Sequence, residues 1–217
     1  MRDLVRSSIL PQAAAGAAFT AFAAYSRLFS WHDAPIPLWA LIIIVFACST
    51  VLWAFVFAWH EKYSNRPVLN FSVPLRAWMA AILCGLSGGV LMHFFVDPML
   101  RPLTPELYPG NFFEWSALLL FKIIFVQLFF CFAPMAFFLR LLPSIKHAAA
   151  ACVGLGIFVS FLKISGLQIP VPAGFALAIL AARGVSAALS VWFYVEGGIL
   201  LSTAWIVCLE LRHFATL

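Results

Sequence analysis

The chain has 217 residues, of which 65% are hydrophobic and only 10% charged, and its formal net charge is +5. A soluble domain carries roughly 25% charged residues, so this chain could not cover a water-facing surface, and the bilayer must be its solvent. The basic residues gather in loops on one side, as the positive-inside rule expects, and we therefore expect no nucleic-acid partner.

The sequence predicts an all-α, polytopic transmembrane helix bundle of about seven spans, in a single membrane domain covering residues 1–217. The first predicted span, 9–29, is rich in small residues that let a neighbouring helix approach closely. Its charged start is like that of a signal peptide, but the apolar part is long enough to favour an uncleaved span. The second span is 35–59. The third, 74–95, carries another close-packing face on its glycines, Gly85, Gly88 and Gly89.

A proline-rich connection at 97–111 predicts a shaped loop rather than a helix. The remaining predicted spans are 112–142, 145–167, 171–194 and 199–213. A tight turn at Glu196-Gly197-Gly198 separates the last two. The distribution of Lys and Arg predicts a protein of the cell membrane, in bacteria the inner membrane, with a cytoplasmic N-terminus and an outer C-terminus.

Among the basic residues within the predicted spans, three are candidates for a site, because an unpaired charge inside the bilayer costs roughly 3 kcal/mol or more. They are Lys122, Arg140 and Arg183, and we find no acidic residue at a depth comparable to that of Lys122 and Arg183. One interpretation is a site for an anionic group such as a lipid phosphate or a carboxylate. The alternative is that these side chains snorkel to the interface or bond to backbone carbonyls.

Arg183 begins a polar stripe on its predicted helix, because offsets of three, seven and eleven residues return to one face. The other members of the stripe are Ser186, Ser190 and Tyr194. The stripe should face protein, water or a ligand, and we include its residues in the candidate ligand or lipid site.

His93 and Asp97 are four residues apart near the outer end of the third predicted span. This spacing places an imidazole and a carboxylate on one helix face, which suits a metal site or a proton relay. Two ligands do not make a metal site, and a third would have to come from the same side of the membrane. The candidates for this third ligand are His32, Asp33, Glu106 and Glu114. The alternative is a helix-end pair satisfied by water and its neighbours.

No catalytic constellation follows from the sequence. There is no glycine-rich phosphate loop, no GxSxG and no HExxH, and the histidines lie near span ends on both sides, which disfavours bis-histidine haem. The five cysteines form no CxxC pair. The sequence therefore identifies no cofactor and no catalytic residue.

Several features of the second half follow a familiar order: Pro134, Arg140, Phe158 and a Gly-Gly turn before the last span. In this order the second half resembles the CAAX-prenyl-protease and bacteriocin-processing (CPBP) family of intramembrane proteases. The family's Glu-Glu-x-x-x-Arg motif would fall on 135–140, where the arginine is kept and Met135 and Ala136 replace both glutamates.

The two remaining CPBP motifs would fall on Phe158 to Leu162 and on Ile206 to Glu210, and neither carries the family's histidine. The resemblance implies a related helical fold that has lost the glutamates and histidines that activate water. Loss of the paired carboxylates removes the general base.

These observations favour a non-catalytic multi-pass membrane protein that acts as a subunit or scaffold. Its expected partners are membrane lipids and other membrane protein subunits, which bind its helices. Two alternatives stay open: a divergent CPBP-type intramembrane hydrolase using Glu196 or Glu210, and a small transporter that attracts an anion with Lys122 and Arg183.

Overall fold

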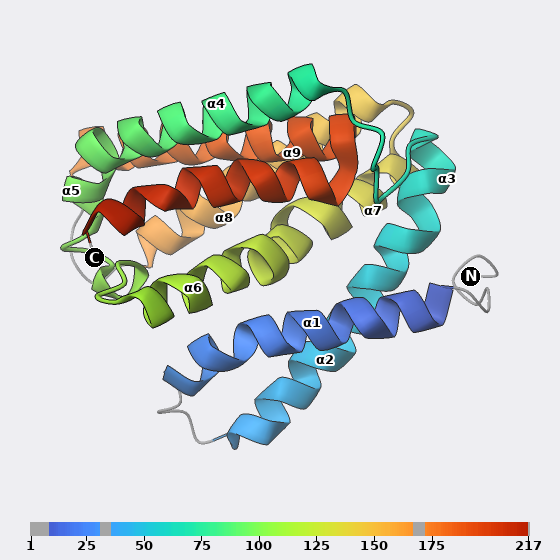
Figure 1. Ribbon diagram of the computed structural model, residues 1–217, viewed down its shortest axis with the longest axis horizontal. Helices are drawn as coiled ribbons and strands as arrows, with labels where there is room; N and C mark the ends of the chain where they lie inside the picture. Colours follow the sequence, from blue (N-terminus) through green and yellow to red (C-terminus); the bar gives the residue numbers. More distant parts are fainter. Residues whose placement is uncertain (1–8, 31–35, 167–171, 217) are drawn as a thin grey trace.

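A computed structural model describes residues 9–30, 36–166 and 172–216 (Figure 1). Within these ranges the chain is helical with no strand, apart from one isolated bridge between Leu69 and Gly198. The helices are α1 (Ile9–Ser30), α2 (Leu38–Phe55), η2 (Val56–His60), α3 (Glu61–Ser64), α4 (Leu75–Leu91), η3 (Met92–Val96), α5 (Asp97–Leu100), η4 (Pro105–Leu107), α6 (Phe112–Leu120), η5 (Phe121–Val126), η6 (Leu128–Phe132), α7 (Ala133–Leu141), α8 (Ile145–Ser165), α9 (Ala173–Glu210) and η7 (Leu211–Thr216).

Five helical stretches in the described ranges are long and apolar enough to cross a membrane. They are Leu38–Ser64, Leu75–Leu100, Phe112–Leu141, Ile145–Ser165 and Ala173–Phe214. The all-helical class is confirmed, and the stretches support a multi-pass membrane protein. Helix α1 is not among the five, and the predicted spans 171–194 and 199–213 fall in one stretch, so the count of about seven stays a prediction.

The longest helix, α9, is a hairpin of two arms that reverses at the predicted Gly197-Gly198 turn. Gly198 has φ 69° and ψ −160°, a conformation that costs glycine little and other residues much. On the second arm Trp205 Nε1 donates to Ser190 Oγ of the first at 3.1 Å, and the rings of Phe193 and Trp205 lie 5.7 Å apart. Figure 1 shows the two arms, orange and red, side by side.

The segment between α3 and α4 closes over the turn of this hairpin. Ile199 N–H donates to the carbonyl of Val68 at 3.0 Å, and Arg66 Nη1 donates to the carbonyl of Val195 at 2.7 Å. A Cβ at Gly198 would overlap the Val68 carbonyl oxygen. Only glycine therefore allows the two backbones to meet at this point.

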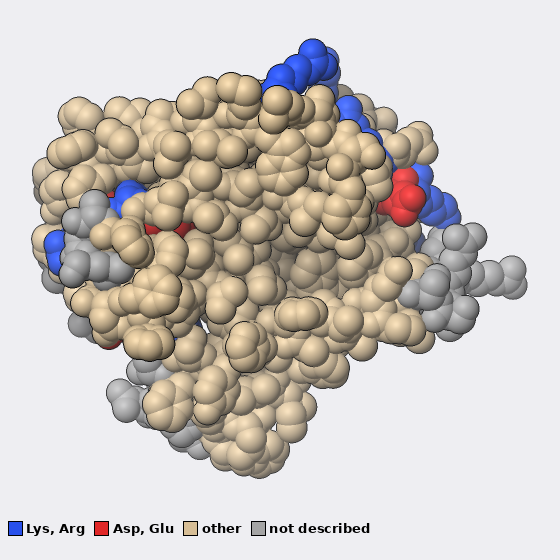
Figure 2. Space-filling view, viewed as in Figure 1, with Lys and Arg blue, Asp and Glu red and all other residues tan. Residues whose placement is uncertain are grey.

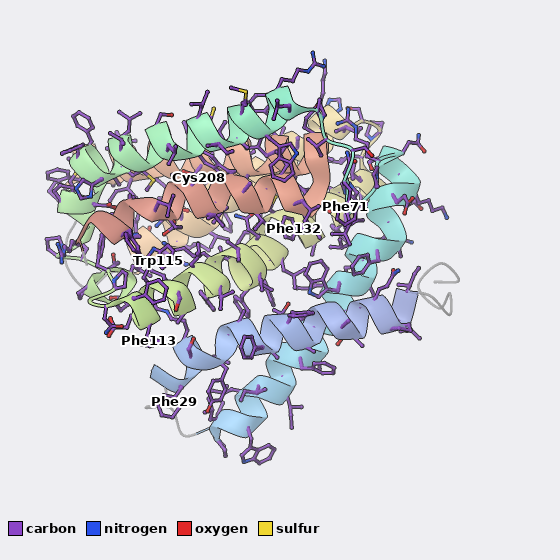
Figure 3. All side chains as sticks on the ribbon, viewed as in Figure 1. Phe29, Phe71, Phe113, Trp115, Phe132 and Cys208 are labelled. Atoms are coloured by element: carbon purple, nitrogen blue, oxygen red, sulfur yellow. The ribbon has the colours of Figure 1, made fainter. Side chains whose placement is uncertain are left out.

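The predicted close-packing glycine faces are real, and the chain's own helices fill them. A Cβ at Gly85 of α4 would lie 2.5 Å from Cys208 Cβ, and Gly89 faces the same arm of α9. Figure 3 labels Cys208 between α4 and this arm. In the first helix a Cβ at Gly16 would lie 2.8 Å from the ring of Trp53 on α2. These faces mediate internal packing.

The connection before α6 forms the predicted shaped loop, although its first residues, α5, continue the preceding helix. Asn111 caps α6 by accepting the Glu114 N–H at 3.0 Å, and Glu114 Oε2 accepts the Gly110 N–H at 2.8 Å. These bonds satisfy amide groups that a helix start leaves open. They fix the loop that carries Tyr108.

The stretch Phe112–Leu141 contains two π-helical segments, η5 and η6, before Pro134 of α7. A π-turn inserts an extra residue into a helix and often marks a functional site. Lys122 lies in η5, so the local widening occurs at one of the charged residues of this stretch.

Helices α1 and α2 form a pair beside the bundle of α4, α6, α8 and α9 (Figure 1). They are joined by a bond from Trp53 Nε1 to Thr20 Oγ1 at 2.9 Å, and Phe132 connects this pair to the core through ring contacts with Trp53 and Tyr194. Figure 2 shows a face that is uncharged over most of its area, with Lys, Arg, Asp and Glu near its edges. Such a surface suits lipid tails.

Candidate functional site

A cluster of charged and polar side chains lies where the loop before α6, η5 and the end of the α9 hairpin meet. We call it the polar cluster, and its members are Asp97, Tyr108, Lys122, Arg183, Glu210, Arg212 and His213. They come from α5, the 101–111 connection, η5, both arms of α9 and η7. Residues far apart in the sequence are therefore brought to one end of the bundle.

Glu210 is the centre of the polar cluster. Its Oε2 lies 2.6 Å from Lys122 Nζ and 3.3 Å from His213 Nε2, and its Oε1 lies 3.5 Å from Arg212 Nη1. Its side chain is 5% exposed. Trp115 Nε1 donates to its backbone carbonyl at 3.1 Å, and Figure 3 shows Trp115 on α6 beside the end of the hairpin. A buried carboxylate needs such partners.

Asp97 is the second carboxylate, and both its oxygens are also engaged. Arg212 Nε donates to Oδ2 at 3.1 Å, and the Tyr108 hydroxyl donates to Oδ1 at 3.0 Å. Burial of Tyr108, followed by the charge of Asp97 and this hydrogen bond, raises the pKa of the phenol well above its ordinary value. Tyr108 therefore acts as a neutral donor.

Arg183 makes the polar cluster cationic. It lies within electrostatic range of Glu210, Arg212 and Asp97, but neither carboxylate of the cluster forms an ion pair with it in the described part of the chain. Lys122, Arg183 and Arg212 thus face two carboxylates, an excess of one positive charge without His213. The arrangement can attract an anion.

The structure corrects one sequence inference, namely that no acidic residue lies at a depth comparable to that of Lys122 and Arg183. Glu210 lies at this depth and pairs with Lys122 across 88 residues of sequence. It stands near the end of the last predicted span, 199–213. Its neighbours Arg212 and His213 were the available signal, because three charged or titratable residues in Glu-Leu-Arg-His would be unusual on a lipid-facing helix.

The stripe that begins at Arg183 does face protein, but it leads away from the polar cluster. Ser186 is half-buried, Ser190 is bonded to Trp205, and Tyr194 is fully buried with its ring 4.6 Å from that of His60. The Tyr194 hydroxyl and both His60 ring nitrogens have no hydrogen-bond partner among the described residues. The stripe thus serves the core of the bundle.

His93 and Asp97 are not brought to a common metal site. The His93 ring packs edge-on against Phe94 at 5.1 Å, whereas Asp97 is engaged by Arg212 and Tyr108. Within the described ranges, no three His, Cys, Asp or Glu side chains are arranged to hold a metal ion. Two of the third ligands that the sequence suggested, His32 and Asp33, lie outside the described residues.

A second feature is a groove of about 310 Å³ between α2, η6, α7 and α8. Its lining is wholly apolar: Leu52, Phe55, Phe129, Ala133, Pro134, Phe137, Phe138 and Leu155. The volume is at the lower end of the range for ligand pockets, roughly 300–1,000 Å³. In a bilayer such a groove can hold hydrocarbon.

Arg140 lies beside this groove, at the end of α7. Its guanidinium stands 4.4 Å from the centre of the Trp59 ring. That ring in turn lies 4.3 Å from Phe55 and 6.4 Å from Phe137, both of which line the groove. The exposed cation is therefore separated from the groove by one aromatic side chain.

No family model, no curated protein and no solved structure matches the chain. The resemblance to CPBP proteases stays a prediction from the sequence. The features of this chain that bear on its function are therefore the polar cluster and the groove.

Proposed function

We propose that this chain is a non-catalytic, multi-pass membrane protein that acts as a subunit or scaffold and binds membrane lipid. The observation behind this proposal is the apolar groove between α2, α7 and α8. An apolar groove offers water no polar partner, whereas a hydrocarbon chain matches it. The glycine faces that could have received a foreign helix are filled internally, so the groove is the better docking feature.

The geometry of the polar cluster supports a structural role for its carboxylates. A general base needs an oxygen that substrate or water can reach, but Asp97 and Glu210 direct all four oxygens at fixed cations or at Tyr108. A divergent intramembrane hydrolase would have to release Glu210 from these partners or use Glu196, which is paired with Arg66 at 3.3 Å. If a hydrolytic activity were found, its persistence in a Glu210→Gln variant would remove Glu210 as its base.

The proposal includes seven crossings, with α1 as the first and the two arms of α9 as the sixth and seventh. Figure 1 supports this topology, because α1 begins and η7 ends at opposite ends of the bundle, as an odd number of crossings requires. With a cytoplasmic N-terminus, the end of α7 would face the cytoplasm and the polar cluster would lie toward the outer side.

The test is gentle extraction from native membrane, followed by mass spectrometry of the intact particle and lipid analysis of the same sample. A lipid retained in stoichiometric amount supports lipid binding, and a stoichiometric partner protein supports the subunit role. A lone chain without lipid would contradict the proposal.

Arg183 favours a second candidate, transport or binding of a small anion at the polar cluster. The observation behind it is the excess positive charge on this cluster. Replacing Arg183 by Gln should then abolish anion flux in proteoliposomes. Unchanged flux in this variant would exclude the role.

A further inference from the structure

We propose that the groove between α2, α7 and α8 holds one acyl chain of an anionic phospholipid whose phosphate is bound by Arg140. This proposal rests on the proposed lipid binding and identifies the class of lipid and the residue that selects it.

The shape of the groove comes from a break in the regularity of the fourth apolar stretch. Two of its lining residues, Ala133 and Pro134, directly follow the π-helical segment η6. Proline has no N–H and clashes with the preceding turn, so the helix cannot close tightly there. Leu155 of α8 forms the opposite wall. The hollow is lined by apolar side chains alone, as an acyl chain requires.

The charge beside the groove decides which lipid fits. Arg140 is exposed, and no carboxylate in the described ranges forms an ion pair with it. The guanidinium lies over the Trp59 ring, 4.4 Å from its centre, and this cation–π contact restricts the position of the charge. A guanidinium held in this way can donate two parallel hydrogen bonds to a phosphate.

Arg140 lies at the end of the apolar stretch that lines the groove. It stands at the last turn of α7, where the chain leaves the apolar stretch, and the groove extends from its aromatic neighbour into that stretch. The next helix begins with exposed Lys146, which adds a second cation at the same end. Cationic side chains and an apolar groove thus adjoin each other, as the headgroup and the tail of a phospholipid do.

The experiment uses the full chain in nanodiscs of phosphatidylcholine that contain a minor share of phosphatidylglycerol with identical acyl chains. Lipids retained on release into detergent are counted by native mass spectrometry. Both lipids carry a phosphate, but the choline ammonium of phosphatidylcholine offsets its charge, so we expect phosphatidylglycerol to be enriched over its share by up to about tenfold at the site of Arg140. Arg140→Gln should remove the enrichment.

The matched control is Arg76→Gln, which removes an exposed arginine at the start of α4, outside the groove, and should leave the enrichment unchanged. Leu155→Trp fills the groove and should lower retention of both lipids. Phosphatidylglycerol with a photoreactive acyl chain provides a measurement without mutation, and should label peptides of α2, α7 and α8.

The outcomes separate this proposal from the proposed function. Retention of both lipids in proportion to their shares, or equal effects of Arg140→Gln and Arg76→Gln, would overturn the headgroup site and leave lipid binding intact. Labelling away from these three helices, or a protein helix recovered in the groove, would overturn the acyl site. A wild-type chain that retains no lipid would contradict the proposed function itself.

Discussion

Removing the ammonium group of Lys122 should destabilise the bundle, because this group neutralises the buried carboxylate of Glu210. The two side chains are 18% and 5% exposed and meet at 2.6 Å. Loss of one partner of a buried pair costs about 3–5 kcal/mol, mostly as the penalty of an uncompensated charge. Glu210 would retain Arg212 at 3.5 Å and His213 at 3.3 Å, so we expect Lys122→Met to cost about 3 kcal/mol, at the lower end of this range.

The assay is unfolding by SDS in mixed micelles, followed by tryptophan fluorescence. Lys146→Met is the matched control, since Lys146 is exposed and its replacement should change stability by no more than about 0.5 kcal/mol. In the double variant with Glu210→Gln the two losses should not add, because the uncompensated charge is gone. Equal effects of Lys122→Met and Lys146→Met, or strict additivity with Glu210→Gln, would refute the role assigned to the pair.

Gly198→Ala should cost about 2 kcal/mol or more, because φ is 69° and the new Cβ would overlap a backbone carbonyl, whereas Gly154→Ala, whose Cβ meets nothing within 4 Å, should be neutral or stabilising in thermal unfolding. Tyr194→Phe should be neutral or stabilise by up to about 1 kcal/mol, since its hydroxyl has no described partner; a clear loss would show that it has one. The raised pKa of Tyr108, caused by burial and by Asp97, favours the neutral phenol in the folded protein. The stability that this pKa shift contributes should therefore be complete below pH 10.0 and be lost as the pH rises above it. In a pH series of unfolding free energies, Tyr108→Phe should lose less stability above pH 10.0 than the wild-type chain does.

The sequence predicted the helical stretches well because apolar runs of sufficient length leave few alternatives in a bilayer. The expected span 112–142 corresponds to Phe112–Leu141 and 145–167 to Ile145–Ser165. The helices that contain the second and third predicted spans continue through the interfacial residues to Ser64 and Leu100. Propensity and hydropathy do not register where a helix ends in polar surroundings.

The polar cluster was predicted only in part, although Lys122, Arg183 and Asp97 were each singled out. Their common site was not predicted, because hydropathy assigns each charge a depth along its own span but no partner on another. Glu210 is the centre of the cluster because the α9 hairpin reverses at Gly198, which places the last arm beside Lys122 of η5. The groove beside Arg140 had no sequence signal either, since its lining consists of ordinary apolar residues from four helices.

The sequence by itself indicated a membrane environment, the helical class and the residues whose burial would need an explanation. These properties follow from composition and local spacing, because a bilayer requires each backbone segment to satisfy its own hydrogen bonds. The tertiary structure decided which glycine faces are filled internally, which carboxylate neutralises Lys122 and where an apolar groove lies next to an exposed arginine. Each of these depends on the register between helices, which apolar sequences specify through side-chain packing and not through any local pattern.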